Sequence, residues 1–182
     1  MEALNHGWPT VYFDADGVLV PEIDRGAEFE QKSGSRWTSA HTMSEFRIVE
    51  GVREIVAEIH AKQHRAIIIT NKPALANGEM LPETYAAMRR ILMGYGFDDI
   101  FTCPHASNSG CTCRKPKPGM LLDAAQVWHS PLERSVFLGD RETDLMAAEA
   151  AGCIGVLLET PRNKGVVAAC RITDLRQILT FI

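Results

Sequence analysis

The stretch Thr-Val-Tyr-Phe-Asp-Ala-Asp-Gly-Val, residues 10–18, decides the fold. Its first half is a short run of β-forming residues, and the run ends on the acid Asp14. Continuous apolar runs of this kind are typical of strands that are buried on both faces, as in parallel sheets. The sequence predicts three more such strands and a weaker one, at residues 65–70, 134–139, 154–158 and, more weakly, 99–102.

Helical patterns lie between these predicted strands. In residues 51–63, for example, Val52, Ile55, Val56 and Ile59 follow a helical stripe. The alternation of strand and helix predicts an α/β fold with a doubly wound, mainly parallel sheet. With 182 residues, we expect one domain over residues 1–182. The predicted helices are 51–63, 82–94, 118–128, 142–151 and a short terminal helix at 173–181.

Composition and charge exclude several classes of protein. The chain is 46% hydrophobic and 23% charged, which is ordinary for a folded globular protein and excludes a disordered or fibrous one. A net charge of −4 argues against an extended nucleic-acid-binding surface. No apolar run is long enough to span a bilayer, and the first basic residue, Arg25, comes too late for a signal peptide. We expect a cytoplasmic protein that is a monomer or a weak dimer.

Two segments interrupt the alternation. Residues 18–46 are polar, contain several glycines and serines, and show few periodic apolar positions, which predicts a long loop. Residues 103–119 contain three cysteines and several basic residues. Too few residues lie between the predicted strands for a cap domain. We therefore expect residues 18–46 to form a flap over the site, although a passive surface insertion is an equal alternative.

Polar residues follow several predicted strands, where ligands bind in open α/β sheets. They are Asp14-Ala-Asp16-Gly17, Thr70-Asn71, Lys115-Pro116 and Gly139-Asp140, with Asp144 one helical turn later. Carboxylates that gather at one edge favour a cation, and hard carboxylate oxygens suit magnesium. A lysine and a hydroxyl at the same edge suit a phosphate.

Each motif alone has a plainer interpretation. Asp14 and Asp16 could belong to an ordinary turn. Asp140 and Asp144 could be a helix cap and a first-turn acid, and Lys115 could lie on a solvated surface. The joint occurrence of the four motifs favours a phosphohydrolase.

In this order, the four motifs resemble those of the haloacid dehalogenase superfamily, and the match spans residues 11–158. The segment Cys103-Pro-His105 … Cys111-Thr-Cys113-Arg114-Lys115-Pro116 further resembles the zinc-loop branch. That branch contains the D-glycero-D-manno-heptose 1,7-bisphosphate phosphatases and the histidinol-phosphate phosphatases. The pattern at residues 70–78 is more similar to that of the heptose bisphosphate phosphatases.

The resemblance implies a phosphoaspartyl mechanism. Asp14 would be the nucleophile and Asp16 the general acid and base. Mg²⁺ would be held by the Asp14 carboxylate, the Asp16 carbonyl and Asp140, with Asp144 behind them, orienting Lys115 or a magnesium-bound water. The residues expected to bind phosphate or substrate are Gly17, Thr70, Asn71, Lys72, Arg114, Lys115 and Arg141.

The cysteines and one histidine predict a second metal site. Cys103, His105, Cys111 and Cys113 form two close pairs that can close a tetrahedral zinc site with no open position. A closed site is structural rather than catalytic. The alternative is a disulfide between Cys111 and Cys113, or free thiols.

Four positions depart from the pattern of the branch. Ala15 replaces the usual Arg, Val18 the usual Thr and Lys72 the usual Gln, and Asn77 stands where a basic residue is common. All four positions lie on the expected leaving-group side of the site. The expected catalytic residues are therefore all present, but the identity of the substrate is not decided.

The sequence thus predicts a magnesium-dependent phosphomonoesterase acting on a small phosphorylated metabolite. A sugar phosphate such as a heptose bisphosphate is the first candidate, and histidinol phosphate is the alternative. Two further alternatives are a phosphatase of nucleic-acid 3′-ends, which the basic Arg114-Lys-Pro-Lys117 patch permits, and a zinc-loop interaction module without activity.

Overall fold

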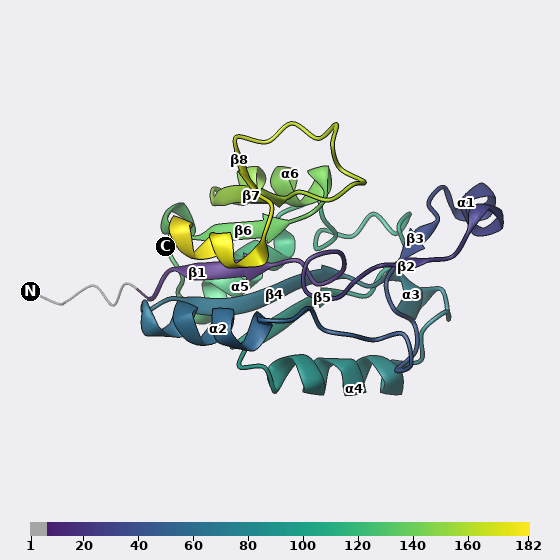
Figure 1. The fold of residues 1–182 in the computed structure, drawn as a ribbon, viewed down its shortest axis with the longest axis horizontal. Coiled ribbons are helices and arrows are strands. Elements are labelled where there is room, and N and C mark those ends of the chain that lie inside the picture. Colours follow the sequence, from purple (N-terminus) through teal and green to yellow (C-terminus); the bar gives the residue numbers. More distant parts are fainter. Residues whose placement is uncertain (1–6) are drawn as a thin grey trace, which may run out of the picture.

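A computed structural model describes residues 7–182 and contains a six-stranded sheet (Figure 1). The strand order is β5-β4-β1-β6-β7-β8, and every neighbouring pair is parallel. The strands are β1 (Thr10–Phe13), β4 (Arg65–Asn71), β5 (Asp99–Cys103), β6 (Val136–Gly139), β7 (Ile154–Leu158) and β8 (Cys170–Ile172).

Helices cover both faces of this sheet and create two apolar layers. One layer joins the sheet to α2, α4 and the 3₁₀ helix η2, and the other joins it to α5 and α6. Alternate residues of each central strand enter different layers: in β1, Phe13 points to the first layer and Tyr12 to the second. The helices are α2 (Val52–Ala61), α4 (Pro82–Met93), α5 (Gly119–Trp128), α6 (Glu142–Ala151) and η2 (Leu175–Phe181).

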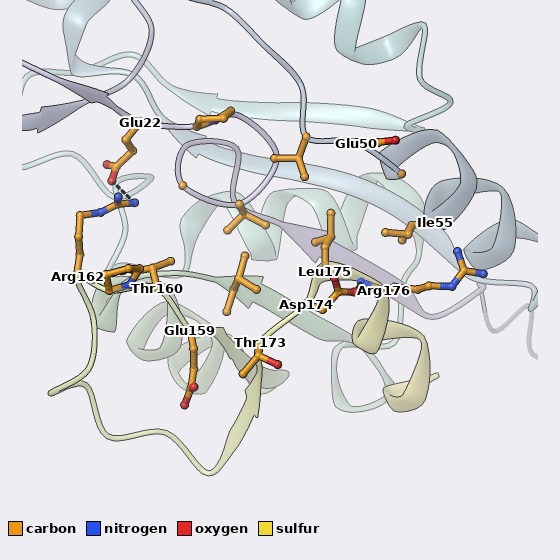
Figure 2. A pocket seen from close by; sticks show the side chains of 17 residues that line it. Glu22, Glu50, Ile55, Glu159, Thr160, Arg162, Thr173, Asp174, Leu175 and Arg176 are labelled. Atoms are coloured by element: carbon orange, nitrogen blue, oxygen red, sulfur yellow. Dashed lines mark hydrogen bonds and ion pairs between the residues drawn. The ribbon is translucent and has the colours of Figure 1, made fainter.

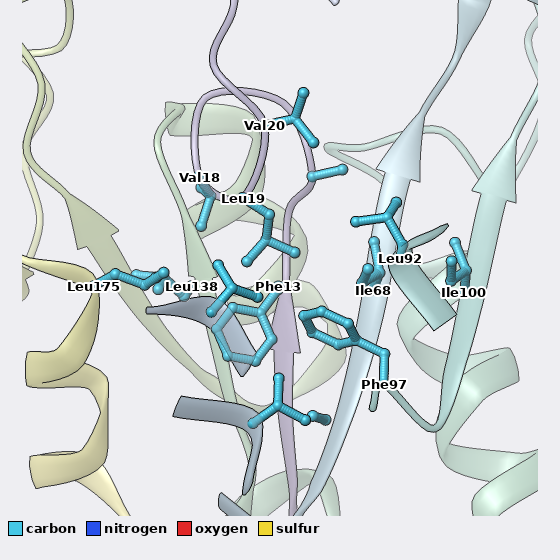
Figure 3. Close-up of a cluster of buried hydrophobic side chains, with 14 of the residues drawn as sticks. Phe13, Val18, Leu19, Val20, Ile68, Leu92, Phe97, Ile100, Leu138 and Leu175 are labelled. Atoms are coloured by element: carbon cyan, nitrogen blue, oxygen red, sulfur yellow. The ribbon is translucent and has the colours of Figure 1, made fainter. Parts of the chain in front are cut away.

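The core of the first layer packs directly under the start of the 14–20 turn. Phe13 meets Phe97 edge to face, with ring centroids 5.7 Å apart (Figure 3). Val18 and Leu19, which follow the Asp-Ala-Asp-Gly motif, are buried in the same cluster. The turn that carries Asp14 and Asp16 is therefore supported by packed apolar side chains.

The predicted α/β fold with a doubly wound parallel sheet is confirmed, and the predicted strands and helices lie within two residues of their observed bounds. Three details differ. Strand β8 was not predicted, the terminal helix is a 3₁₀ helix, and β6 begins at Val136 because Leu132–Arg134 form a 3₁₀ turn, η1. The single domain and the lack of a cap domain stay predictions.

The predicted loop at 18–46 is more ordered than expected. It contains β2 (Ile23–Asp24) paired antiparallel with β3 (Trp37–Thr38), and between them α1 (Ala27–Ser33), which projects beyond the carboxyl ends of the strands (Figure 1). We call residues 18–46 the flap. One further short helix, α3 (Pro73–Ala76), follows β4. Within residues 7–182, no helix has the length and apolar character needed to cross a bilayer.

Candidate active site

The carboxyl ends of β1, β4 and β6 open into a cavity of about 340 Å³. Asp14 and Asp16 follow β1, Asn71 ends β4, and Arg141 and Asp144 follow β6. Lys115 and Arg114 enter the same wall from the segment that precedes α5. The structure thus brings together most of the polar residues that the sequence placed at strand ends, although Thr70 and Asp140 are not among the residues that line the cavity.

Lys115 is the buried cation of this cavity. Its ammonium lies 2.7 Å from Asp14 Oδ1 and 2.8 Å from Asp144 Oδ1, and it donates to the Ile69 carbonyl at 3.1 Å. The side chains of Lys115 and Asp144 are 3% and 1% exposed. Asp144 also accepts from the Arg141 amide at 3.0 Å, so one carboxylate caps α6 and orients Lys115.

Burial and mutual repulsion change how these carboxyls ionise. Burial, followed by the charges of Asp14, Asp144 and Glu22, raises the pKa of Asp140 to about 8. Burial also raises the pKa of Asp14, although Lys115 opposes the shift. Burial acts to lower the pKa of the Lys115 ammonium, but the two neighbouring carboxylates outweigh it and the net shift is upward. The single positive charge of Lys115 does not balance the carboxyls of Asp14, Asp140 and Asp144.

The arrangement fits a hard cation. Oxygens of Asp14, Asp140 and Asp144 lie within 4.8 Å of one another. Asp140 Oδ1 is buried and has no hydrogen-bond partner among the described residues. Gly17 has φ +86°, and a Cβ there would lie 2.3 Å from Asp140 Oδ2, so glycine leaves the room that the carboxylate occupies. Mg²⁺ prefers carboxylate oxygens as ligands, and a buried carboxylate oxygen that lacks a hydrogen-bond partner can serve as one.

Thr70 and Asn71 have different surroundings although they are neighbours. Thr70 is 1% exposed, and its Oγ1 is buried without a hydrogen-bond partner in the described chain, so its hydroxyl is available to an anion. The Asn71 amide oxygen accepts from the Lys115 backbone N–H at 3.2 Å, and its Nδ2 donates to the Lys115 carbonyl at 3.3 Å. Asn71 therefore fixes the backbone that carries Lys115, besides lining the cavity.

Two of the other basic residues predicted to bind substrate, Arg114 and Arg141, also line the cavity, whereas Lys72 does not. Arg114 lines it and donates from Nη2 to Ser107 Oγ at 3.0 Å, while its buried Nη1 has no partner within residues 7–182. Arg141 lines it too and pairs with Glu22 of the flap. Lys72 does not point freely to a ligand, because its ammonium contacts Asp16.

The predicted zinc ligands converge beside the cavity. Cys103 Sγ lies 3.6 Å from Cys111 Sγ and 3.6 Å from His105 Nδ1, and His105 Nδ1 lies 3.3 Å from Cys113 Sγ. Ligands about 2.3 Å from a tetrahedral zinc ion are separated by about 3.8 Å, close to these distances. None of the five cysteines takes part in a disulfide in this structure. The four side chains could hold a metal ion.

The flap forms the side of the cavity that faces away from the sheet. Trp37, His41 and Phe29 line it together with Asp14 and Asp16. Four charged flap residues pair with one another: Arg25 with Glu45 at 2.5 Å, and Arg36 with Asp24. The flap therefore presents aromatic, imidazole and hydroxyl side chains to the cavity, together with the carboxylate of Glu22.

Sequence analysis missed two residues that follow β7. Arg162 stacks on the Trp37 ring at 4.7 Å and pairs with Glu22 at 3.0 Å, which ties the flap to the sheet. Buried Asn163 donates to the backbone carbonyls of Asp140 and Leu158, each at 2.8 Å, and so fixes the strand end that carries Asp140. The strand-end rule used for the other motifs also covers residues after β7 and could have found both.

A larger cavity, of about 570 Å³, lies beyond the Glu22–Arg162 pair (Figure 2). It is bounded by residues after β7 and β8, among them Glu159 and Asp174, and by Val49–Gly51 before α2. None of Asp14, Asp16 and Lys115 lines it. The smaller cavity therefore contains the candidate chemistry.

Comparison with known proteins shows which family the chain resembles. A family model described as HAD-hydrolase-like matches residues 112–169. The D-glycero-beta-D-manno-heptose-1,7-bisphosphate 7-phosphatase of Vibrio cholerae is 32% identical over 157 residues, which cover 79% of this chain and 77% of the relative. The phosphatase of the same name from Bordetella bronchiseptica is 32% identical over 164 residues, or 87% of this chain and 84% of the relative.

Solved structures give the same result. The crystal structure of D,D-heptose 1,7-bisphosphate phosphatase from B. bronchiseptica, complexed with magnesium and phosphate, has a TM-score of 0.77 at 28% identity and covers 94% of this chain and 96% of that one. A putative HAD-like phosphatase from Mesorhizobium loti, at 21% identity and a TM-score of 0.71 over 96% of this chain and 86% of its own, shares the fold. With relatives at 32% identity over more than two thirds of both chains, this protein belongs to the haloacid dehalogenase-like phosphatases, which are phosphoric monoester hydrolases.

Proposed function

We propose that this chain is a magnesium-dependent phosphatase that releases phosphate from a small sugar phosphate, with a heptose bisphosphate as the leading substrate. The observation that carries the proposal is the Asp14–Lys115–Asp144 cluster, with Asp16 in the wall of the same 340 Å³ cavity. A cavity of this size suits a small molecule. Relatives that are named heptose bisphosphate phosphatases support the choice of sugar.

Magnesium would be held by the Asp14 carboxylate, the Asp16 backbone carbonyl and Asp140, with Asp144 just behind them. Asp140 Oδ1, buried without a partner in the described chain, supports this assignment. When bound, the ion supplies positive charge that offsets the phosphate oxygens and lets three carboxyls stay ionised together.

In the first step, a carboxylate oxygen of Asp14 attacks phosphorus and the ester oxygen leaves. Asp16 donates a proton to that oxygen, so the products are an aspartyl phosphate on Asp14 and the free sugar hydroxyl. Lys115 offsets the charge of the transferring group, and the Thr70 hydroxyl and the backbone amides after Asp16, including that of Gly17, donate to its oxygens.

In the second step, the now ionised Asp16 takes a proton from water. The water oxygen attacks phosphorus and the bond to Asp14 breaks, which releases inorganic phosphate and restores both carboxyls. The same side chain therefore acts first as an acid and then as a base. Asp16 suits this role because it is two residues from Asp14 and lines the same cavity.

The rest of the substrate would lie between the sheet edge and the flap. Arg114 would use its Nη1, which has no partner among the described residues, on an anionic or hydroxyl group of the sugar, and Arg141 and Asn71 would form the neighbouring wall. Trp37 and His41 of the flap would cover the leaving group and exclude water.

We propose that zinc occupies the Cys103, His105, Cys111 and Cys113 cluster and is structural. The four ligands leave no open coordination position. Cys113 is two residues from Lys115, so the ordered loop would also fix the lysine of the active site.

A panel of phosphate esters, assayed for release of inorganic phosphate with Mg²⁺ and with EDTA, tests the proposal. We expect release with Mg²⁺ only, and faster turnover of heptose bisphosphate and related sugar phosphates than of histidinol phosphate. A preference for histidinol phosphate, or for a 3′-phosphate on duplex DNA, would assign a different substrate. No release from any ester would contradict the proposed activity.

A further inference from the structure

The carboxylate of Asp16 has its own buried cation, separate from Lys115. The Lys72 ammonium lies 2.7 Å from Asp16 Oδ1 and 2.5 Å from Oδ2, so it bonds both oxygens. The two side chains are only 6% and 14% exposed. Charge-assisted bonds of this length, shielded from water, fix a carboxylate much more firmly than a surface ion pair does.

Lys72 is itself fixed from several sides. Its backbone N–H donates to the Cys103 carbonyl at 2.8 Å, which joins it to the end of β5, and α3 begins at the next residue. Its ammonium lies 6.0 Å from the centroid of the Tyr85 ring, and the Tyr85 hydroxyl is bonded to Thr102 Oγ1. The backbone of Lys72 is thus fixed to the end of β5, and its ammonium lies beside Tyr85 of α4, elements that do not belong to the flap.

Two buried lysines pair with different acids of the site. Lys115 contacts Asp14 and Asp144, and Lys72 contacts Asp16. Asp16 stands in a turn after β1, where rotation about two side-chain bonds could turn its carboxylate away from the reacting oxygen. An acid or base must lie within about 2.6–3.2 Å of the atom that it serves, and a misplacement of about 1 Å can cost about 100-fold in rate.

We propose that Lys72 is a positioning residue that holds the Asp16 carboxylate in the orientation needed for leaving-group chemistry. This inference rests on the proposed function, because it assigns Lys72 an action through Asp16 rather than on substrate. One Asp16 oxygen would turn from Lys72 to the leaving oxygen of the bound ester while the other stays bonded to the ammonium.

This arrangement predicts a dependence on the leaving group. An alkyl phosphate, such as a sugar phosphate, needs a well-placed acid because its leaving oxygen is strongly basic. An aryl phosphate such as 4-nitrophenyl phosphate leaves as a stable anion and needs the acid much less. Loss of Lys72 should therefore slow the first kind of ester and spare the second.

The experiment compares kcat and KM of Lys72→Met and Lys72→Arg on 4-nitrophenyl phosphate and on the best sugar phosphate of the panel. Lys164→Met, at an exposed lysine, is the matched control. We expect Lys72→Met to lose about 10- to 100-fold in kcat on the sugar phosphate and less than about threefold on the aryl ester, with KM little changed. Lys72→Arg should recover part of the loss.

A double variant separates action through Asp16 from any other role. If Lys72 acts through Asp16, Lys72→Met in an Asp16→Ala background should cause no further loss on the sugar phosphate. Lys72→Gln, which retains an N–H donor, replaces Lys72→Met in both comparisons if that variant does not fold.

A raised KM with unchanged kcat would make Lys72 a direct substrate ligand and overturn the proposal. An equal loss on both esters, or additive losses in the double variant, would also overturn it. Failure of the wild-type protein to hydrolyse either ester would instead contradict the proposed function, so the two failures are distinguishable.

Discussion

The sheet edge and the flap line one cavity but are held in opposite ways. At the edge, the side chains of Asp14, Lys115 and Asp144 are at most 8% exposed, and they project from elements attached to buried strands. In the flap, Arg36 and Asp24 pair while their side chains are 42% and 36% exposed. Exposed ion pairs contribute about 0–1 kcal/mol each, so this outer part of the flap is held less firmly than the edge, although buried Glu22 ties the base of the flap to Arg141 and Arg162.

The two regions also differ in the direction in which their surroundings shift the pKa of a carboxyl group. Burial raises the pKa of Asp140 at the edge to about 8, whereas the hydrogen bond from Arg25 lowers the pKa of Glu45 in the flap to about 2. A cation would therefore relieve the repulsion at the edge, whereas Arg25 already neutralises Glu45 in the flap. This difference suggests that the edge carries the chemistry and the flap the recognition, and the following experiments test that division.

The largest effect is expected from Asp14→Asn at the edge. An amide cannot form the aspartyl phosphate, so turnover should fall roughly 10⁴-fold or more on every ester, measured as phosphate release. Asp123→Asn, on an exposed position of α5, is the matched control and should keep full activity. A near-wild-type rate for Asp14→Asn would exclude the covalent mechanism, provided that circular dichroism shows both variants folded.

Asp16→Ala should have the next largest effect, and a selective one. General acid catalysis contributes about 10²- to 10⁴-fold, so alkyl phosphates should slow by that amount while aryl phosphates slow much less. The ratio of kcat on the two ester types measures this selectivity. An equal loss on both types would indicate that Asp16 serves only to bind metal or to shape the turn.

The residues at the edge could be predicted because strand ends decide where they lie. Asp14 and Asp140 follow strands that are buried on both faces, and such strands are visible as continuous apolar runs. Strand β8 escaped prediction because it has only three residues, and β2 and β3 have two each, too few to show a period. The contact between Lys72 and Asp16 depends on how two turns meet in space, which no local pattern encodes.

Removal of the zinc that we propose for the Cys/His cluster should affect stability before chemistry. Structural zinc sites have apparent binding free energies of about 10–16 kcal/mol at neutral pH, so Cys113→Ser should lower the melting temperature and reduce activity through Lys115. Cys170→Ser, a half-buried thiol of β8 outside the cluster, is the control. Elemental analysis that finds no zinc in gently purified wild-type protein would contradict the assignment.

The pH dependence of stability should separate the edge from the flap. A carboxyl whose pKa is raised by folding stabilises the fold below its unfolded pKa, and this contribution is lost as pH rises through the folded value. For Asp140 the loss spans about pH 4 to 8, so metal-free protein should melt at lower temperature at pH 8 than at pH 5. Glu45 has the opposite sign, but its stabilisation is complete above about pH 4.5.

Added Mg²⁺ and the substitution Asp140→Asn complete the test of pH-dependent stability. Added Mg²⁺ should raise the melting temperature more at pH 8 than at pH 5, because it binds the ionised carboxyls. Asp140→Asn, which cannot ionise, should flatten the decline between these pH values. A melting temperature of the metal-free wild type that is constant or rises over this range would show that the edge does not store the proposed repulsion.

The smallest effect is expected in the flap. Shortening the segment between Gly26 and Ser39 removes Trp37 from the cavity and from its stacking on Arg162. Because the edge remains complete, kcat should change little, while KM for the sugar phosphate should rise roughly tenfold, or about 1.4 kcal/mol of binding. The KM for 4-nitrophenyl phosphate should change much less, since that ester needs only the strand-end site. Trp37→Ala, which keeps the backbone, should show a milder form of the same split. If the deletion changes the kinetic constants of both esters equally, the flap is a passive insertion. Substrate recognition would then have to be assigned to the Asn77 and Arg114 side of the cavity.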